Sequence, residues 1–119
     1  MAKIHSYDDH DTVVRKYAEL VQKNNPDQFK VFTNLADGDI AKVGGIAPDI
    51  VLKDTKGSKI LTVIEVESST SIDNTRAEER WKPIADAVKS FQLLIPKGTL
   101  ARANRICKKI GIKAKLQEY

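Results

Sequence analysis

The stretch ILTVIEVE at residues 60–67 contains the clearest strand pattern in this chain of 119 residues. Its apolar side chains fall on both faces of an extended segment, which is typical of a central strand covered on both sides. Side chains alternate along a strand with a period of two, so Glu65 and Glu67 point to the same face. The sequence therefore predicts a buried strand that ends in two acidic side chains on one side.

Helical and strand patterns alternate on both sides of this stretch. Strands are predicted at 28–33, 49–53, 90–95 and 112–116, and helices at 11–24, 75–89 and 99–110. The order is helix, three strands, helix, strand, helix, strand, which implies a mixed sheet covered by helices. We therefore expect one three-layer α/β domain over residues 1–119, with a flexible segment at 1–10 and a mobile, glycine-containing connection at 34–47.

Cysteine and histidine content and hydropathy limit the kinds of site that this chain can hold. The one cysteine, Cys107, cannot form an internal disulfide, and the two histidines near the N-terminus lack the spacing of a zinc site. We expect Cys107 to be an inert packing residue, and His5 and His10 to be exposed and incidental. No stretch approaches the roughly 20 apolar residues of a membrane span, and the N-terminus lacks a secretory signal. We therefore expect a cytoplasmic protein with no membrane partner.

A third acidic residue begins the strand that precedes 60–67. Asp49 follows Pro48, and a turn near Gly57 pairs this strand with the next one and brings Asp49 beside Glu65. Clustered carboxylates repel one another and lose solvation unless a positive charge lies among them, and Mg²⁺ accepts such oxygen ligands. The alternative is that each acid marks a strand end at the surface. The pattern as a whole favours a metal site.

The residues Pro48-Asp49 and Glu65-Val66-Glu67, which follow an N-terminal helix, resemble the motifs of the PD-(D/E)xK nuclease superfamily. That superfamily includes restriction endonucleases, archaeal Holliday-junction resolvases and repair nucleases, and its common core matches the elements predicted over 11–95. The resemblance implies a restriction-endonuclease-like fold. It also implies that Asp49, Glu65 and the backbone carbonyl of Val66 bind Mg²⁺ or Mn²⁺, which activates water to hydrolyse a DNA phosphodiester.

Glu67 departs from the superfamily's pattern, because the last motif position is usually lysine. A minority of restriction endonucleases have glutamate there, so Glu67 indicates either a variant catalytic site or a weakened one. A lysine elsewhere could replace the missing cation, and the candidates are Lys42, Lys53 and Lys82. The superfamily often adds a catalytic acid from the first helix, where Glu19 is the candidate and a solvated surface glutamate is the alternative.

Basic residues dominate the C-terminal part of the chain. From Lys97 to Lys115 there are seven lysines and arginines and no acidic residue, a block that suits contact with a phosphate backbone. A solvated surface is the alternative. The candidate nucleic-acid contacts of the whole chain are Lys42, Arg76, Arg80, Lys82, Arg102, Arg105, Lys108 and Lys109. Those at 76–82 lie among acidic residues, so an exposed face of mixed charge explains them equally well.

The function expected from these features is a Mg²⁺-dependent DNA endonuclease, either a monomer that recognises strand or structure or a homodimer that places two sites across a duplex. Two alternatives stay open. A module with the nuclease fold could bind nucleic acid without cleaving it, which Glu67 in the lysine position favours. An assembly protein could use the same fold as a scaffold, and would then lack affinity for nucleic acid.

Overall fold

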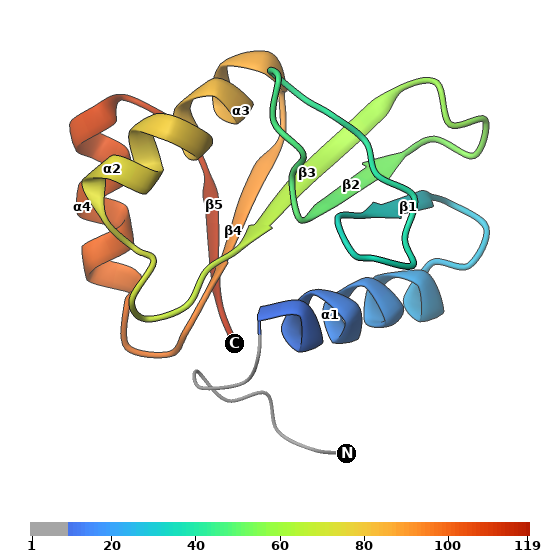
Figure 1. The fold of residues 1–119 in the computed structure, drawn as a ribbon, viewed down its shortest axis with the longest axis horizontal. Coiled ribbons are helices and arrows are strands. Elements are labelled where there is room, and N and C mark those ends of the chain that lie inside the picture. The colour runs from blue at the N-terminus through green and yellow to red at the C-terminus, as the bar shows by residue number, and fades with distance from the viewer. Residues whose placement is uncertain (1–9) are drawn as a thin grey trace.

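A five-stranded mixed sheet forms the centre of the structure, a computed structural model that describes residues 10–119 (Figure 1). The strands lie side by side in chain order: β1 (Lys30–Thr33), β2 (Ile50–Lys53), β3 (Ile60–Val66), β4 (Phe91–Ile95) and β5 (Lys115–Glu118). The first three strands form an antiparallel meander, whereas β3, β4 and β5 are parallel. The parallel pairs require long crossover connections, and both of these contain helices.

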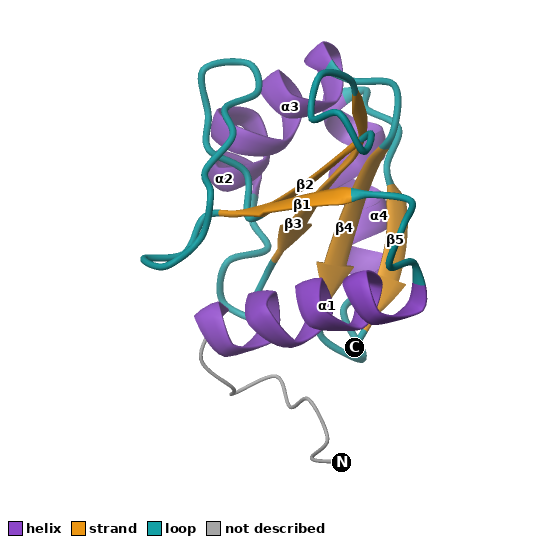
Figure 2. Ribbon diagram, turned by 90° about the vertical axis from the view of Figure 1, so that its right-hand side faces the viewer, coloured by secondary structure: helices purple, strands orange, loops and turns teal. Residues whose placement is uncertain are grey.

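Helices cover both faces of the sheet (Figures 1 and 2). One face packs against α1 (His10–Asn24), where Val13 and Val14 join a buried cluster with Ile50 and Ile64 of the sheet. This arrangement and the sheet pairing confirm the predicted α/β class with a mixed sheet.

The opposite face packs against α4 (Leu100–Ile110) and a continuous helical segment formed by α2 (Asn74–Arg76), the π-helix η1 (Ala77–Trp81) and α3 (Lys82–Ala87). Trp81 and Cys107 belong to the buried cluster on this side, so the packing position predicted for Cys107 is confirmed.

The helical segment between β3 and β4 contains one widened turn. In η1 the Lys82 N–H donates to the carbonyl of Ala77, five residues earlier, instead of to the usual carbonyl four residues earlier. Pro83 follows at once, and a proline ring clashes with the carbonyl four residues before it. The wider turn relieves that contact and lets the segment continue as one helix across the sheet.

The connection between β1 and β2, which was predicted to be mobile at 34–47, packs against the rest of the fold. Leu35 and Val43 are buried, and Val43 and Ile46 exchange two backbone hydrogen bonds of 2.7 and 3.0 Å. Gly44 lies so close to α3 that an added Cβ would be 2.8 Å from the Pro83 carbonyl oxygen. These contacts hold the connection in place, and they give no support to the predicted mobility.

The last strand lies further along the chain than predicted. β5 pairs with β4 from Lys115 to Glu118, whereas the sequence pattern predicted 112–116. Ile112 and Ala114 pack against the core but lie outside the paired strand. The alternation therefore showed which side chains face inward, and the parallel register with β4 decided where the strand begins.

No helix within residues 10–119 is long and apolar enough to cross a membrane. Residues 1–9, which include His5 and most of the segment predicted to be flexible, lie outside the described residues.

Candidate functional site

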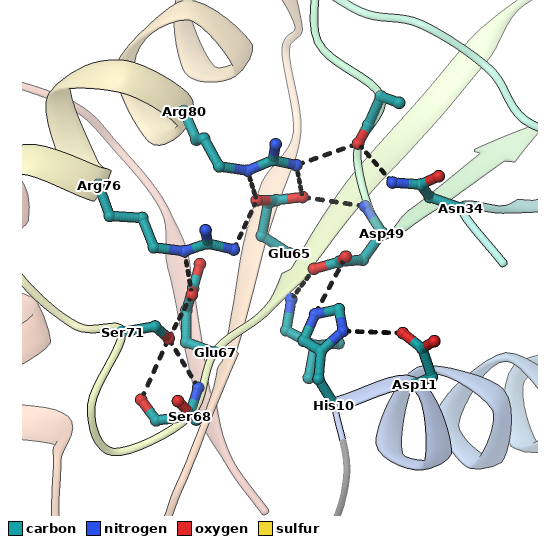
Figure 3. A network of polar contacts seen from close by, with 12 residues as sticks. His10, Asp11, Asn34, Asp49, Glu65, Glu67, Ser68, Ser71, Arg76 and Arg80 are labelled. Carbon is teal, nitrogen blue, oxygen red and sulfur yellow. Dashed lines mark hydrogen bonds and ion pairs between the residues drawn. The ribbon is translucent and has the colours of Figure 1, made fainter.

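Three acidic side chains meet where β2 and β3 lie next to each other, and we call them the acidic centre (Figure 3). Asp49 directly precedes β2, Glu65 lies on β3, and Glu67 follows the last residue of β3. The pairing of Ile50 with Ile64 places Asp49 beside Glu65, and the Asp49 N–H donates to Glu65 Oε1 at 2.9 Å. The three residues are 4%, 0% and 1% exposed, so the predicted convergence takes place in the interior.

Arg80 closes this centre over Glu65 with two parallel hydrogen bonds. Its Nε donates to Glu65 Oε2 at 2.8 Å and its Nη2 to Oε1 at 3.0 Å, the geometry of a strong bidentate ion pair. The same Nη2 donates to the Ala47 carbonyl at 3.0 Å. Burial raises the pKa of Glu65, and the hydrogen bonds from Arg80 oppose that rise. A charged Glu65 therefore depends on this arginine.

Glu67 is surrounded by donors from the loop and helical segment that follow it. Ser71 Oγ donates to Oε1 at 2.7 Å, Arg76 Nε donates to the same oxygen, and Trp81 Nε1 donates to Oε2 at 2.8 Å. Tyr119 Oη donates to the Glu67 backbone carbonyl at 2.8 Å. The helical pattern predicted at 75–89 could not show that the Trp81 indole N–H has a carboxylate partner.

The first helix contributes His10 to the acidic centre. His10 Nε2 lies 3.1 Å from Asp49 Oδ1, within ion-pair distance although it is not aligned as a hydrogen bond. Contact with Asp49 raises the pKa of His10 to about 9, against the lowering effect of burial. The prediction that His10 is exposed and incidental is therefore wrong. The helix approaches with its first residue, which no periodic pattern indicates, and Glu19 is exposed further along α1.

The side chains as they lie do not fit a divalent metal ion. Every carboxylate oxygen of Asp49, Glu65 and Glu67 already has an N–H, O–H or cationic partner. The Val66 N–H, for example, donates to Asp49 Oδ2 at 2.8 Å. Within residues 10–119, no three His, Cys, Asp or Glu side chains are placed to hold a metal ion. The ligand roles of Asp49, Glu65 and the Val66 carbonyl toward Mg²⁺ or Mn²⁺ stay predictions.

Arginines, not lysines, supply the positive charge at this centre. Within the part of the chain that the structure describes, no ion pair joins Lys42, Lys53 or Lys82 to the three acids. Lys42 is exposed, and Lys53 Nζ lies 4.8 Å from the centre of the Phe32 ring. Lys82 Nζ pairs with Asp86 at 3.3 Å. The lysine candidates followed from the superfamily's usual motif residue, whereas Arg76 and Arg80, predicted as nucleic-acid contacts, pair with the acids instead.

A second candidate site lies on α4, where three exposed basic side chains border a pocket. Arg102, Arg105 and Lys109 are spaced by three and four residues, so they share one side of the helix, and we call them the basic face. They line a pocket of about 390 Å³ together with Ile72, Asp73, Asn74 and Ile106. Lys108 is exposed but lies outside this lining. The block at 97–115 indicated basic charge, and the helical spacing within it could have indicated a shared face.

Comparisons of this chain with family models, with curated proteins and with solved structures found no match. The resemblance to PD-(D/E)xK nucleases therefore rests on the motif residues and on the order of the elements that carry them.

Proposed function

We propose that this domain binds the sugar–phosphate backbone of DNA through the basic face of α4, on a fold of the restriction-endonuclease type. The observation that carries the proposal is the convergence of three exposed cations on one pocket. Guanidinium groups match the geometry of phosphate oxygens, and phosphate contacts dominate the affinity of proteins for DNA. The acidic residue in the lining, Asp73, already accepts the Arg76 N–H at 2.8 Å.

The order and pairing of the elements support the fold assignment. A helix, an antiparallel meander, a helical crossover and a parallel strand follow one another, as in the common core that the resemblance implies. The loop after β3 links the two candidate sites. Its Ser71 donates to Glu67, and its Ser69 carbonyl accepts from Arg102 Nη2 at 2.6 Å. Phosphate held at the basic face would therefore lie on the same side of the sheet as this loop.

The proposal is tested by measuring how DNA affinity depends on salt. A labelled DNA duplex is titrated with wild type and with the double variant Arg105→Ala/Lys109→Ala, over a range of NaCl concentrations. Each lost phosphate contact lowers the slope of log K against log salt by about 0.9, so we expect a decrease of about 1 to 2. The control is Lys56→Ala/Lys59→Ala, which removes the same charge from the exposed turn between β2 and β3.

An equal decrease in the control variant would mean that DNA binding depends on overall charge and not on the basic face. No measurable binding by wild type would remove the proposal and leave the assembly role as the remaining prediction. A homodimer, which would place two basic faces along one duplex, also stays a prediction, and sedimentation of the wild type with and without the duplex tests it.

A metal-dependent nuclease is the second candidate function, favoured by the position of Asp49 and Glu65 at the ends of neighbouring strands. The Arg76 and Arg80 side chains are 30% and 27% exposed, so a substrate phosphate can reach them. The test is cleavage of DNA by wild type in Mg²⁺ or Mn²⁺, compared with Asp49→Ala and Glu65→Ala. Cleavage that both variants lose would establish this candidate, and binding without cleavage would establish the first.

A further inference from the structure

We propose that Arg76 and Arg80 occupy the place that the family resemblance gives to a divalent cation, so the acidic centre is held by protein cations alone. The inference does not rest on DNA binding by α4, and it concerns only the residues around Asp49, Glu65 and Glu67. Three carboxylates face two guanidinium groups and the His10 ring.

The hydrogen bonds of the two arginines hold their positive charges directly against the carboxylates. Arg80 holds both oxygens of Glu65 through Nε and Nη2, at 2.8 and 3.0 Å, and ties itself to the Ala47 carbonyl. Arg76 extends across two acids, because its Nε donates to Glu67 and its Nη2 lies 3.9 Å from Glu65 Oε2 (Figure 3). Arg76 thus joins two neighbouring carboxylates, and Arg80 pairs with one of them.

The widened turn of η1 places these cations. Arg76, Arg80 and Trp81 all donate to Glu65 or Glu67, although in a regular α-helix residues 76 and 81 point in different directions. A turn closed by a hydrogen bond over five residues brings 76, 80 and 81 closer to one side of the helix. π-helical turns are rare in proteins overall, but those that occur are often found at functional sites. This turn therefore fits a role in positioning side chains around the acidic centre.

Burial leaves a hydrated ion no free oxygen to approach. The Glu65 and Glu67 side chains have no exposed surface, and the Arg76 and Arg80 side chains, 30% and 27% exposed, lie at the outer edge of the cluster. Mg²⁺ sheds its water reluctantly and keeps several waters in most protein sites. It would have to displace an arginine from a bidentate, charge-assisted pair before it could bind.

The experiment is a metal titration of the whole chain, followed by calorimetry and by thermal unfolding. Wild type should show no stoichiometric binding of Mn²⁺ or Mg²⁺ and no change of Tm. Arg80→Ala leaves Glu65 buried without its main cation, so its Tm without metal should fall by on the order of 10 °C. Mn²⁺ should restore most of that loss, because the ion then takes the empty position beside Glu65 and Asp49.

Two further variants make the result specific. Arg15→Ala is the matched control, since Arg15 forms a bidentate pair of 3.0 and 3.1 Å with Asp37 in which both side chains are exposed. It should lose little Tm and gain nothing from Mn²⁺. Glu65→Gln/Arg80→Ala removes both charges, and it should be more stable than Arg80→Ala without metal and indifferent to Mn²⁺.

Stoichiometric binding of Mn²⁺ by wild type, with the arginines in place, would overturn the inference. So would a folded Arg80→Ala that ignores Mn²⁺, because the position would then not suit a cation of that kind. If Arg80→Ala does not fold without metal, recovery of its fold on adding Mn²⁺ supports the inference, and failure to recover counts against it. The wild-type titration decides in either case.

Discussion

At Glu67 the surroundings determine what the side chain can do. Its two oxygens accept from Ser71, Arg76 and Trp81 in a fully buried position. A lysine there would match the usual motif of the PD-(D/E)xK superfamily, but it would place an ammonium group among three hydrogen-bond donors. The three donors require a hydrogen-bond acceptor at this position, which explains why glutamate is found here in place of lysine.

Glu67→Lys should lower the free energy of unfolding by about 3 to 5 kcal/mol, because it leaves a buried cation next to Arg76 with no acceptor. Glu67→Gln keeps the shape and one accepting oxygen, and should cost roughly 1 to 3 kcal/mol. Urea unfolding followed by circular dichroism measures both. A Glu67→Lys variant as stable as wild type would contradict this account, and one that gained DNA cleavage would point to a lapsed nuclease.

His10 gives the fold a dependence on pH. Its pKa is raised from 6.5 to about 9 beside Asp49, with a smaller contribution from Asp11, so its stabilising effect is complete below pH 6.5 and is lost as pH rises through 9. The ring is half-buried and screened by solvent, and we expect an effect on the order of 1 kcal/mol. The stability difference between wild type and His10→Gln should therefore be largest near pH 6 and vanish near pH 10. A difference that is constant over this range would exclude the ion pair.

At the scale of elements, the 34–47 connection is attached to α3 through a glycine. Gly44 has a φ of 60°, and an added Cβ would lie 2.8 Å from the Pro83 carbonyl oxygen, whereas Gly45 has a φ of 81° and open space around it. Both positions favour glycine for their backbone conformation. Gly44 alone also requires glycine for close packing.

Gly44→Ala should therefore be less stable than Gly45→Ala by about 1 to 2 kcal/mol. Positive φ strains the backbone of both variants, but only the alanine at 44 also clashes with a neighbouring carbonyl. Chemical unfolding of the two variants measures the difference. Equal losses would mean that the connection moves away from α3 without cost, and would return it to the mobile loop that the glycine content predicted.

The same elements show how far the sequence predicts the site. The hairpin between β2 and β3 was predictable, because strand periodicity and the turn near Gly57 together place Asp49 beside Glu65. The partners of these acids were not. Arg80 pairs with Glu65 from within the π-helical turn, and His10 approaches Asp49 from the first residue of α1. Both depend on tertiary packing, which local patterns do not contain.

On the scale of the whole molecule, the acidic centre and the basic C-terminal block lie in different surroundings. The three acids of the centre are buried and paired, whereas the lysines and arginines at 97–115 are exposed. Because no acidic residue interrupts the block at 97–115, a chain with a net charge of +4 presents positive charge to its surroundings along this block. If DNA binds on the α4 side, as we propose, it meets cations that are not paired with the buried acids.

This separation predicts how divalent ions act on DNA binding. Millimolar Mg²⁺ competes with protein cations for phosphate, so it should weaken binding of a DNA duplex by wild type, more strongly than NaCl of equal ionic strength. Glu65→Gln, checked for folding by circular dichroism, should show the same weakening, because an acidic centre closed by Arg76 and Arg80 takes up no ion. Fluorescence anisotropy under matched ionic strength provides the measurement. If Mg²⁺ instead strengthened binding by wild type and not by Glu65→Gln, the ion would be joining DNA to the acidic centre, and the metal-dependent nuclease would become the better account of this fold.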